Sequence, residues 1–494
     1  FHLAWTHAQV EMRYLKLDGS QANLFQRIAS RTVIRIPAKC PAVGTPGGRE
    51  TLWKLGISGD LPIIFMHAKD EDSLPNVRTI AKAQEFLSLK GLPADLVIVY
   101  EGGDAYLCPL RDKLAELVQT ASGRPYNRIT ALAREMLSDN DLATLMAAAC
   151  LVLDGGEALE PQLKAPVVTN AYTVFEPGAC QGRAHVPKQL KAFDNGWGGY
   201  VNQGTEYCID VTDRPPLPWS NLLVGESLGS LVSAGGGGYT WAGNARMTRL
   251  TPFRNDALTD VPGEGVLVRC DRTGDSFSTA PDMYASGRYR VTHGFGYTVF
   301  ERYGGVYSSL TMFVDTKLPL KTSLLKLVNN TEREETFSVY YYAEPVLADK
   351  AAAGIRARFE GGRLMASSPF GEAGNAIFIA IPGMDVHYTA SAQEFFGVPG
   401  HNIRPEALKI AELSDNVGCG ATLLALQTHV TLQPGEQTTL TLLMGYGDQR
   451  TVEELCAARD AEKRLEKVRQ RWRELVGGIR VTTPAKSFDM LVNG

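Results

Sequence analysis

The spacing of apolar residues changes near residue 165, and this change constrains the fold of the chain more than any other feature. Before that point, short apolar runs alternate with segments whose apolar residues recur every three or four positions. Such alternation is typical of helices packed against a sheet. From 165 to about 447 the helical spacing disappears, and short alternating runs lie between turns rich in Gly, Asn, Asp and Pro. This second pattern predicts a large antiparallel β-sandwich.

The first part, residues 1–164, is expected to form a small α/β segment. The runs 61–68 and 94–100 are predicted strands. The helix between them has Ser73 as its expected N-cap and Gly91 just beyond its end. Another helix is expected to begin at Ser138 or Asp139 and to stop only at Gly155.

The second part, residues 165–447, is the predicted sandwich. Alternate residues of the run 337–343 are apolar and should share one buried face. Two strand-like runs flank the turn 433–437 and predict a hairpin. After the sandwich, an apolar stripe along 451–476, opposite a face rich in Lys, Arg and Glu, predicts one long helix that acts as a connector.

Composition and motif spacing argue against several kinds of partner and cofactor. The 494 residues have a formal net charge of −4, which gives no basic face for nucleic acid. No apolar run is long enough for a membrane span, so we expect no membrane contact within these residues. The eight cysteines have no C-x-x-C pair and the histidines are dispersed. We therefore expect neither a metal site nor a disulfide framework, but reduced thiols in a cytoplasmic protein.

The glycine run 235–238 suggests a phosphate loop, but its context argues against one. A phosphate-binding loop needs a preceding strand, a following helix N-terminus and a defined glycine spacing, often with a Lys. The run fits neither the G-x-x-x-x-G-K-[ST] pattern nor the G-x-G-x-x-G pattern. The run is therefore interpreted as a turn between strands.

The segment after the glycines is too polar for a sandwich interior. An aromatic face with amide and guanidinium donors suits a sugar ring and its hydroxyl groups, and arginine also suits phosphate. The alternative is a surface loop whose arginines pair with nearby carboxylates, Asp256, Asp260 and Glu264 among them. The candidate substrate-binding residues are Trp241, Asn244, Arg246, Arg249, Arg254 and Asn255.

Three other polar residues are possible catalytic groups. Asp210 and Asp213 could act as an acid–base pair on a glycosidic bond. Asp213 directly precedes Arg214, however, so an ion pair that stabilises a turn is the competing interpretation. His293 could be a base, but a lone histidine in a strand is more often packed. Asn329 matches a glycosylation pattern and is interpreted as a turn residue.

Five ordered motifs of this chain resemble those of a known family. The likeness is to glycoside hydrolase family 94, the inverting disaccharide and oligosaccharide phosphorylases, and in particular to its β-1,2-glucan branch. That branch includes 1,2-β-oligoglucan phosphorylase and the phosphorylase-like part of cyclic β-1,2-glucan synthase. The motifs are "FDNGWGGY", "YCIDVTDRPPLPWSNLL", "GYTWAGNARMTRLTPFRNDALTDVPGE", "YRVTHGFGYTVFE" and "TSLLKLVNNTEREETFSVYYYAE".

The resemblance implies a domain plan and a reaction. Residues 448–486 would be a helical linker, and 487–494 the start of a truncated (α/α) barrel. The general acid would lie beyond Gly494, so no catalytic residue is assigned here and we expect this polypeptide alone to be inactive. Inorganic phosphate would be the co-substrate, without a metal or organic cofactor. Phosphorolysis of a β-1,2-glucooligosaccharide would yield α-glucose 1-phosphate.

The resemblance also implies how the sandwich takes part. In related phosphorylases its loops border the active site, often that of the partner subunit in a homodimer, and the loop 241–255 is the candidate here. Two alternatives remain open. The chain could be the central region of a membrane-anchored cyclic β-1,2-glucan synthase, or a non-catalytic carbohydrate-binding or dimerisation module.

Overall fold

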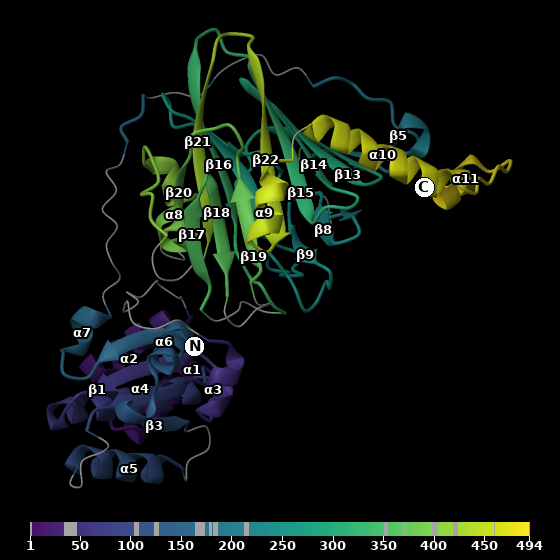
Figure 1. Ribbon diagram of the computed structural model, residues 1–494. Helices are drawn as coiled ribbons and strands as arrows, with labels where there is room; N and C mark the ends of the chain where they lie inside the picture. Colours follow the sequence, from purple (N-terminus) through teal and green to yellow (C-terminus); the bar gives the residue numbers. More distant parts are fainter. Residues whose placement is uncertain are drawn as a thin grey trace. The chain divides into compact units, whose positions relative to one another are not determined.

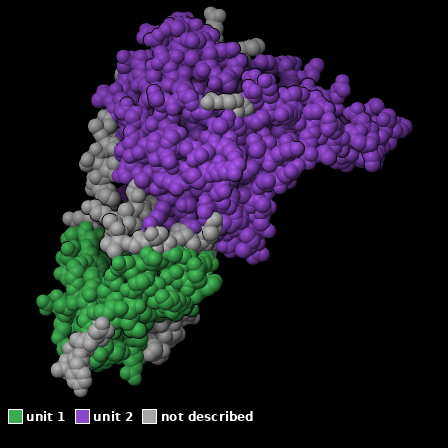
Figure 2. All heavy atoms as spheres, viewed as in Figure 1, with its two compact units in different colours: residues 1–168, 418–420 green, residues 169–417, 421–494 purple. Residues whose placement is uncertain are grey.

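The chain folds into two compact units, Phe1–Val168 with Gly418–Gly420, and Thr169–Val417 with Ala421–Gly494 (Figure 2). The first is α/β and the second is mainly antiparallel β. The computed structural model describes residues 2–33, 47–102, 108–122, 128–163, 173–176, 180, 186–211, 217–349, 354–368, 372, 374–397, 404–417, 423–458 and 460–493.

A four-stranded parallel sheet of order β3-β2-β1-β4 forms the centre of the first unit. Helix α4 packs on β1 and β2, α6 on β1 and β4, and α5 on β3, so the sheet is buried by the helices that connect its strands. The elements are α1 His2–Tyr14, α2 Gly19–Val33, α3 Arg49–Lys54, β1 Ile63–Ala68, η1 Glu71–Ser73, α4 Leu74–Leu89, β2 Asp95–Tyr100, α5 Pro109–Ser122, β3 Ile129–Ala133, η2 Arg134–Met136, α6 Asp139–Ala148, β4 Ala149–Asp154 and α7 Leu159–Gln162.

The helix expected over 138–155 is wrong in its second half. Ser138 does cap α6, since its side chain accepts from the Asp141 N–H and the Asp141 side chain returns the bond. The helix ends at Ala148, and β4 begins at once and pairs with β1 in parallel. A continuous apolar run does not by its spacing distinguish a helix from a buried strand, and pairing with β1 decides between them.

At the start of α4, the side chain that makes the capping bond is Asp70 and not the predicted Ser73. Ser73 occupies the N-cap position but its side chain makes no capping bond. Asp70 accepts from the Ser73 N–H instead and caps the short η1 turn that leads into the helix. The capping carboxylate therefore stabilises the combined start of both elements.

Three antiparallel sheets form the second unit (Figure 1). Their orders are β17-β18-β19-β22-β15-β14-β13-β12-β6-β5, β11-β10-β16-β21-β20 and β7-β8-β9. The strands are β5 Gly198–Val201, β6 Glu206–Val211, β7 Ser220–Val224, β8 Leu228–Ser233, β9 Gly238–Ala242, β10 Glu264–Cys270, β11 Ser276–Ser278, β12 Arg288–Gly294, β13 Tyr297–Tyr303, β14 Val306–Val314, β15 Leu320–Asn329, β16 Glu335–Ala343, β17 Arg356–Glu360, β18 Arg363–Ser367, β19 Ala376–Ala380, β20 His387–Thr389, β21 Leu424–Leu432 and β22 Gln437–Gly447.

The main hydrophobic core of this unit takes residues from all three sheets. In β16, the alternation expected from the sequence is confirmed: Phe337, Val339 and Tyr341 belong to that core. The intervening Tyr340 and Tyr342 are also buried, in a second cluster that includes Phe395 of α8, Ala392–Phe396. This sheet is therefore covered on both faces in its middle.

The hairpin expected around 433–437 is wrong. Strand β21 pairs with β16 and β20, whereas β22 pairs with β15 and β19, so the turn crosses from one sheet to another. Strands β15 and β16 cross in the same way, and Asn329 ties the two crossings together. Its buried side chain donates to the carbonyls of Arg333 (2.7 Å) and Leu432 (2.9 Å). Asn329 is thus the last, buried residue of β15, so its interpretation as a turn residue is wrong: its side chain bonds to the neighbouring turns instead.

The single helix expected over 451–476 is also wrong, because the stripe is divided between two helices. Helix α9, Gln449–Cys456, packs on β19 and β22, and α10, Ala461–Gly477, packs on β13 and β14. Asp460, just before α10, has a left-handed backbone with φ of 56°. Since the two halves of the stripe enter different apolar clusters, the helix axis must change between them. A last helix, α11, spans Lys486–Asn493, and its place in a barrel stays a prediction.

Candidate functional site

The glycine run forms the turn between β8 and β9. Gly236 and Gly238 have φ of 83° and 120°, a region in which side chains other than glycine's are strained. A Cβ at Gly237 would lie 2.0 Å from the Asp260 carboxylate, which lies against the run and accepts from the Ser233 hydroxyl. A carboxylate therefore takes the space that a phosphate would need, and the interpretation as a turn between strands is confirmed.

Residues 241–255, which follow this turn, are named here the polar loop. An aromatic cluster lies at its two ends. Tyr239 lies 4.9 Å from the ring of Trp241 and 4.5 Å from that of Phe253, between ring centroids. The Trp241 ring lies so close to Gly229 on β8 that a Cβ there would be 2.3 Å from it. Because Phe253 is exposed and Tyr239 and Trp241 are partly so, this cluster offers an apolar surface to solvent.

Sequence reasoning selected Trp241 but missed its two neighbours. Tyr239 is two positions earlier in the same strand, so it must project from the same face. That spacing was a usable signal. Phe253 reaches the cluster only because the chain returns after the polar loop, which no local spacing indicates.

The three arginines of the polar loop differ in how far they are engaged. Arg249 lies over the rings of Tyr239 and Phe253 and donates to the carbonyls of Ala245 (3.4 Å) and Asp349 (2.9 Å). Arg254 donates to both carboxylate oxygens of Glu344, at 2.8 and 2.9 Å. Its acid partner is therefore 90 positions away rather than in the adjacent acidic run.

Arg246 contrasts with both. It is exposed, and its guanidinium has no hydrogen-bond or ion-pair partner among the residues that the structure describes. Asn244 organises the turn beneath it, since its Oδ1 accepts from the N–H groups of Arg246 and Met247 at 2.9 Å each. Arg246 is therefore the one arginine of the polar loop whose guanidinium has no partner among the described residues.

A groove of about 280 Å³ opens beside the end of the polar loop. That volume is near the lower limit of small-molecule sites. Asn255 has a left-handed backbone with φ of 51° where the chain turns along the groove. The lining comprises Leu217, Pro218, Ser220, Leu231, Ser233, Gly238, Phe253, Arg254, Asn255, Asp256, Ala257, Asp260 and Val261. Arg254 and Asn255 thus border the groove, whereas Trp241, Asn244, Arg246 and Arg249 do not line it.

The acids that might have neutralised the arginines are used elsewhere. Asp256 accepts from the N–H groups of Leu258 (3.0 Å) and Thr259 (3.3 Å) and closes its own turn. Glu264 forms a buried ion pair with Lys321. Burial raises the pKa of Glu344, while the Arg254 guanidinium opposes this shift.

Asp210 is engaged in two ion pairs and is poorly suited to proton transfer. Its carboxylate accepts from Lys191 Nζ at 2.6 Å and from Arg290 Nε at 2.9 Å. Partial burial would raise its pKa, but the bonds from Lys191 and Arg290 outweigh burial and lower it. Asp213 lies outside the described residues.

His293 is a packed residue in β12. Burial of the imidazole lowers its pKa to about 4, so it is neutral at physiological pH. Its Nδ1 contacts the Thr298 hydroxyl at 3.1 Å. These contacts fit the interpretation as a packed strand residue.

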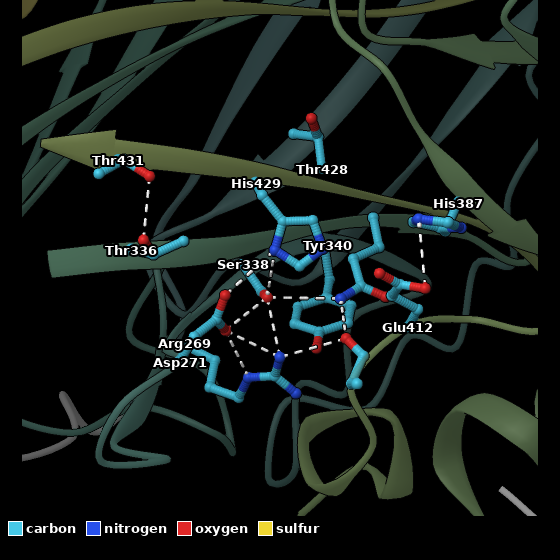
Figure 3. A network of polar contacts seen from close by, with 12 residues as sticks. Arg269, Asp271, Thr336, Ser338, Tyr340, His387, Glu412, Thr428, His429 and Thr431 are labelled. Atoms are coloured by element: carbon cyan, nitrogen blue, oxygen red, sulfur yellow. Dashed lines mark hydrogen bonds and ion pairs between the residues drawn. The ribbon is translucent and has the colours of Figure 1, made fainter. Parts of the chain in front are cut away.

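A second polar cluster, which the sequence did not indicate, lies at β10, β16 and β21 on the face of the sheet opposite the main core (Figure 3). It contains Asp271, Ser338 and His429, the side chains of a hydrolytic triad. Ser338 and Asp271 both contact the same ring nitrogen, Nδ1 of His429, at 3.2 and 3.1 Å. A proton relay needs the serine and the acid on opposite nitrogens. The three residue types of a hydrolytic triad are therefore present, but they are not arranged as one.

Arg269 explains what this cluster does. Its buried guanidinium donates to Asp271 (2.8 and 2.9 Å), to Ser338 (2.9 Å) and to the carbonyls of Leu408, Ile410 and Ala411. These carbonyls lie in the segment 404–417 that crosses the sheet. Burial would raise the pKa of Asp271, but bonds from His429, Ser338 and Arg269 lower it. The cluster fastens that segment to the sandwich.

Comparison with known proteins assigns this architecture to a class. A model of the glycosyl hydrolase 94 supersandwich domain matches residues 205–474, more than half of the chain. The chain therefore belongs to the glycosyl hydrolase 94 family.

Individual curated relatives match different shares of this chain. The cyclic beta-(1,2)-glucan synthase NdvB of Rhizobium meliloti is 28% identical over 99% of this chain and 19% of its own length. The N,N'-diacetylchitobiose phosphorylase of Vibrio furnissii is 23% identical over 60% of this chain and 40% of its own. The solabiose phosphorylase of Paenibacillus borealis is 25% identical over 55% and 37%. The chain thus spans well under half of each of these curated relatives.

One further finding bears on the membrane question. Among the helices that the structure describes, none combines the length and the apolar content required to cross a bilayer.

Proposed function

We propose that this chain is the part of a family 94 enzyme that presents the polar loop to a β-1,2-linked glucooligosaccharide. The observation that carries the substrate class is the span of the likeness to the cyclic β-1,2-glucan synthase, which runs through both units. The likeness to the two phosphorylases named above covers only 55% to 60% of the chain. This difference in coverage supports a β-1,2-linked glucan as the proposed substrate.

The polar loop supplies the binding chemistry in this proposal. The aromatic surface of Tyr239, Trp241 and Phe253 suits the C–H face of a glucosyl ring. Arg246, which has no partner among the described residues, can donate to hydroxyl or phosphate oxygens. Arg254 and Asn255 extend the donors into the adjoining groove. The loop joins these features on one short stretch of chain.

The reaction proposed for the whole protein is inverting phosphorolysis. Inorganic phosphate attacks the anomeric carbon of the terminal glucosyl unit, while a general acid protonates the departing glycosidic oxygen. The C–O bond to the leaving sugar breaks as the bond to phosphate forms, giving α-glucose 1-phosphate. Phosphate is itself the nucleophile, so no metal or organic cofactor is required. In this proposal the chain binds the oligosaccharide and contacts a second copy in a homodimer, but it supplies no catalytic residue. The whole protein is proposed to act in the cytoplasm.

A second candidate is the central region of a cyclic β-1,2-glucan synthase. The same 99% coverage favours it. There the polar loop would hold the glucan rather than a phosphorolysis substrate. The two candidates differ in the product of the whole protein, which is glucose 1-phosphate in the first and a cyclic glucan in the second.

Titration calorimetry with glucooligosaccharides of defined linkage tests the shared part of both candidates. We expect β-1,2-linked oligosaccharides to bind this chain more tightly than β-1,3- or β-1,4-linked ones. Trp241→Ala should weaken binding, whereas Trp53→Ala, at a tryptophan that is 61% exposed in the first unit, should not. Equal affinity for all linkages, or equal binding by Trp241→Ala, would overturn the proposal.

A further inference from the structure

Three potential metal ligands from distant parts of the sequence meet inside the sandwich. The Sγ atoms of Cys180 and Cys270 and a carboxylate oxygen of Glu335 all lie within 4.8 Å of one another, and all three residues are buried. Cys270 ends β10 and Glu335 begins β16, and the two strands pair with Cys270 opposite Phe337. Glu335 is therefore a diagonal neighbour of Cys270 at the same end of the sheet.

Cys180 is brought to this pair by bonds to the turn after β10. Its N–H donates to Asp275 Oδ2 at 3.3 Å, and its sulfur lies 3.7 Å from the Thr273 hydroxyl. The turn is itself closed by the bonds Gly274 N–H to Cys270 O and Cys270 N–H to Asp275 O, each 2.8 Å. The positions of both sulfurs are thus set by the same turn.

The charges around the cluster suit a divalent cation. Arg272 donates to the two carboxylate oxygens of Glu335, whose side chain is 1% exposed. Two thiolates and this carboxylate would carry three negative charges. Arg272 also donates to Glu176 at 3.1 Å, so its charge is shared and a divalent cation is needed to offset the thiolates. A buried charged group is stable only when it is compensated in this way.

The donor set and spacing point to the identity of the cation. We propose that Cys180, Cys270 and Glu335 bind a thiophilic divalent cation of the zinc type, with Arg272 orienting the carboxylate. Tetrahedral zinc with bonds of ~2.3 Å to sulfur and ~2.1 Å to oxygen places neighbouring ligand atoms roughly 3.5–3.8 Å apart. The three ligand atoms lie within 4.8 Å of one another, so small side-chain movements reach that spacing. The fourth position is left to water.

The thiols themselves already interact. The hydrogen bond between them lowers the pKa of Cys270 and raises that of Cys180, because Cys270 gains a donor when it ionises. A disulfide would account for the two sulfurs. It would not account for the carboxylate directed at them, with Oε2 of Glu335 3.4 Å from Sγ of Cys270. Metal binding uses all three groups and releases the thiol protons to solvent.

Cobalt titration of the reduced, full 494-residue chain tests this site. We expect one tightly bound Co²⁺ with a thiolate-to-metal charge-transfer band and the intense visible bands of a tetrahedral ion, all displaced by one equivalent of Zn²⁺. Cys180→Ser and Cys270→Ser should each lower the affinity by more than about 100-fold, since loss of an outer-shell partner alone costs 10–100-fold. Cys208→Ser, at a buried cysteine outside the cluster, should leave the spectrum unchanged.

A second measurement keeps the test valid if a variant fails to fold. In the unmodified protein, Zn²⁺ should protect Cys180 and Cys270 from alkylation, as mapped by mass spectrometry, and leave Cys208 at its basal rate. The proposal would be overturned by the absence of a charge-transfer band in the reduced protein. A spectrum that persists in the Cys180→Ser/Cys270→Ser double variant would also overturn it, as would unchanged alkylation with Zn²⁺.

Discussion

Arg269 and Arg246 are both arginines of the sandwich unit, yet their surroundings are opposite. Arg269 is 1% exposed and donates to a carboxylate, a hydroxyl and the carbonyls of a crossing segment. Arg246 is exposed, and no partner for its guanidinium lies among the described residues. A buried arginine must spend all its donors on the fold, whereas an exposed one keeps them for a ligand. The first arginine should therefore govern stability and the second binding.

The largest effect is expected from Arg269→Met, which should lower the free energy of unfolding by about 3–5 kcal/mol. Removing the guanidinium leaves the partly buried Asp271 carboxylate without its cation and the carbonyls of the segment 404–417 without their donor. Urea denaturation of this variant and of Arg471→Met, at an exposed arginine of α10, measures the difference. The control should change by less than about 0.5 kcal/mol. Comparable values for both variants would mean that the buried cluster does not fasten the segment 404–417.

Arg246→Ala should show the opposite separation. We expect a loss of about 1.5–3 kcal/mol in oligosaccharide or phosphate binding, roughly ten- to a hundredfold, for one charge-assisted hydrogen bond. The unfolding free energy should stay within about 0.5 kcal/mol of the original. Calorimetry and denaturation of the same preparations check both values, with Arg471→Ala as the matched control. Unchanged binding would return Arg246 to the role of a solvated surface residue.

Arg254→Ala should be intermediate, because Arg254 both pairs with Glu344 and borders the groove. Its loss should affect stability and binding together, as measured by denaturation and calorimetry of one preparation. If the loss of binding were fully explained by the fraction of unfolded protein, the groove end of the polar loop would take no part in binding.

Ser338→Ala should have a smaller effect, about 1 kcal/mol of stability. The hydroxyl donates to Asp271 and accepts from Arg269, but Arg269 keeps its bonds to Asp271 and to the crossing carbonyls. Binding to oligosaccharides should not change. If the whole protein lost an activity in this variant while its unfolding curve stayed the same, Ser338 would be a nucleophile and the structural account of the cluster would be wrong.

The smallest effect concerns Asp210, whose side chain is 41% exposed, so that solvent screens its ion pairs. Its pKa is lowered in the folded state. The stabilisation is therefore present above the unfolded pKa of about 3.9 and is lost as pH falls through the folded value. The stability difference between the original protein and Asp210→Asn should be under ~1 kcal/mol, constant above about pH 5 and smaller below it. A difference that grows on acidification would contradict this sign.

Local sequence patterns predicted many of the helices and strands. The alternation in β16 and the cap at Ser138 follow from side chains within a few positions of one another. The errors arose where a partner far away decided the outcome. The run 149–154 became a strand because β1 was available to pair with it, and the stripe 451–476 was divided because two clusters lie in different directions.

The candidate site divides in the same way. The sequence indicated a donor-rich loop, and the glycine spacing by itself argued against a phosphate loop. The sequence did not indicate that Glu344 would engage Arg254, nor that Phe253 would join the aromatic cluster. These contacts depend on how strands from separate parts of the chain return to one place.

The sequence by itself determined that one part of the chain would be α/β and the other an antiparallel sandwich, since hydrophobic period reports which faces are buried. Only the tertiary structure decided that β21 and β22 belong to different sheets, and that Cys180, Cys270 and Glu335 meet. The reason is physical. Whether a residue is buried depends largely on its own polarity, which the local sequence shows. Strand pairing and metal coordination depend on residues dozens of positions apart, and only the folded chain brings those residues together.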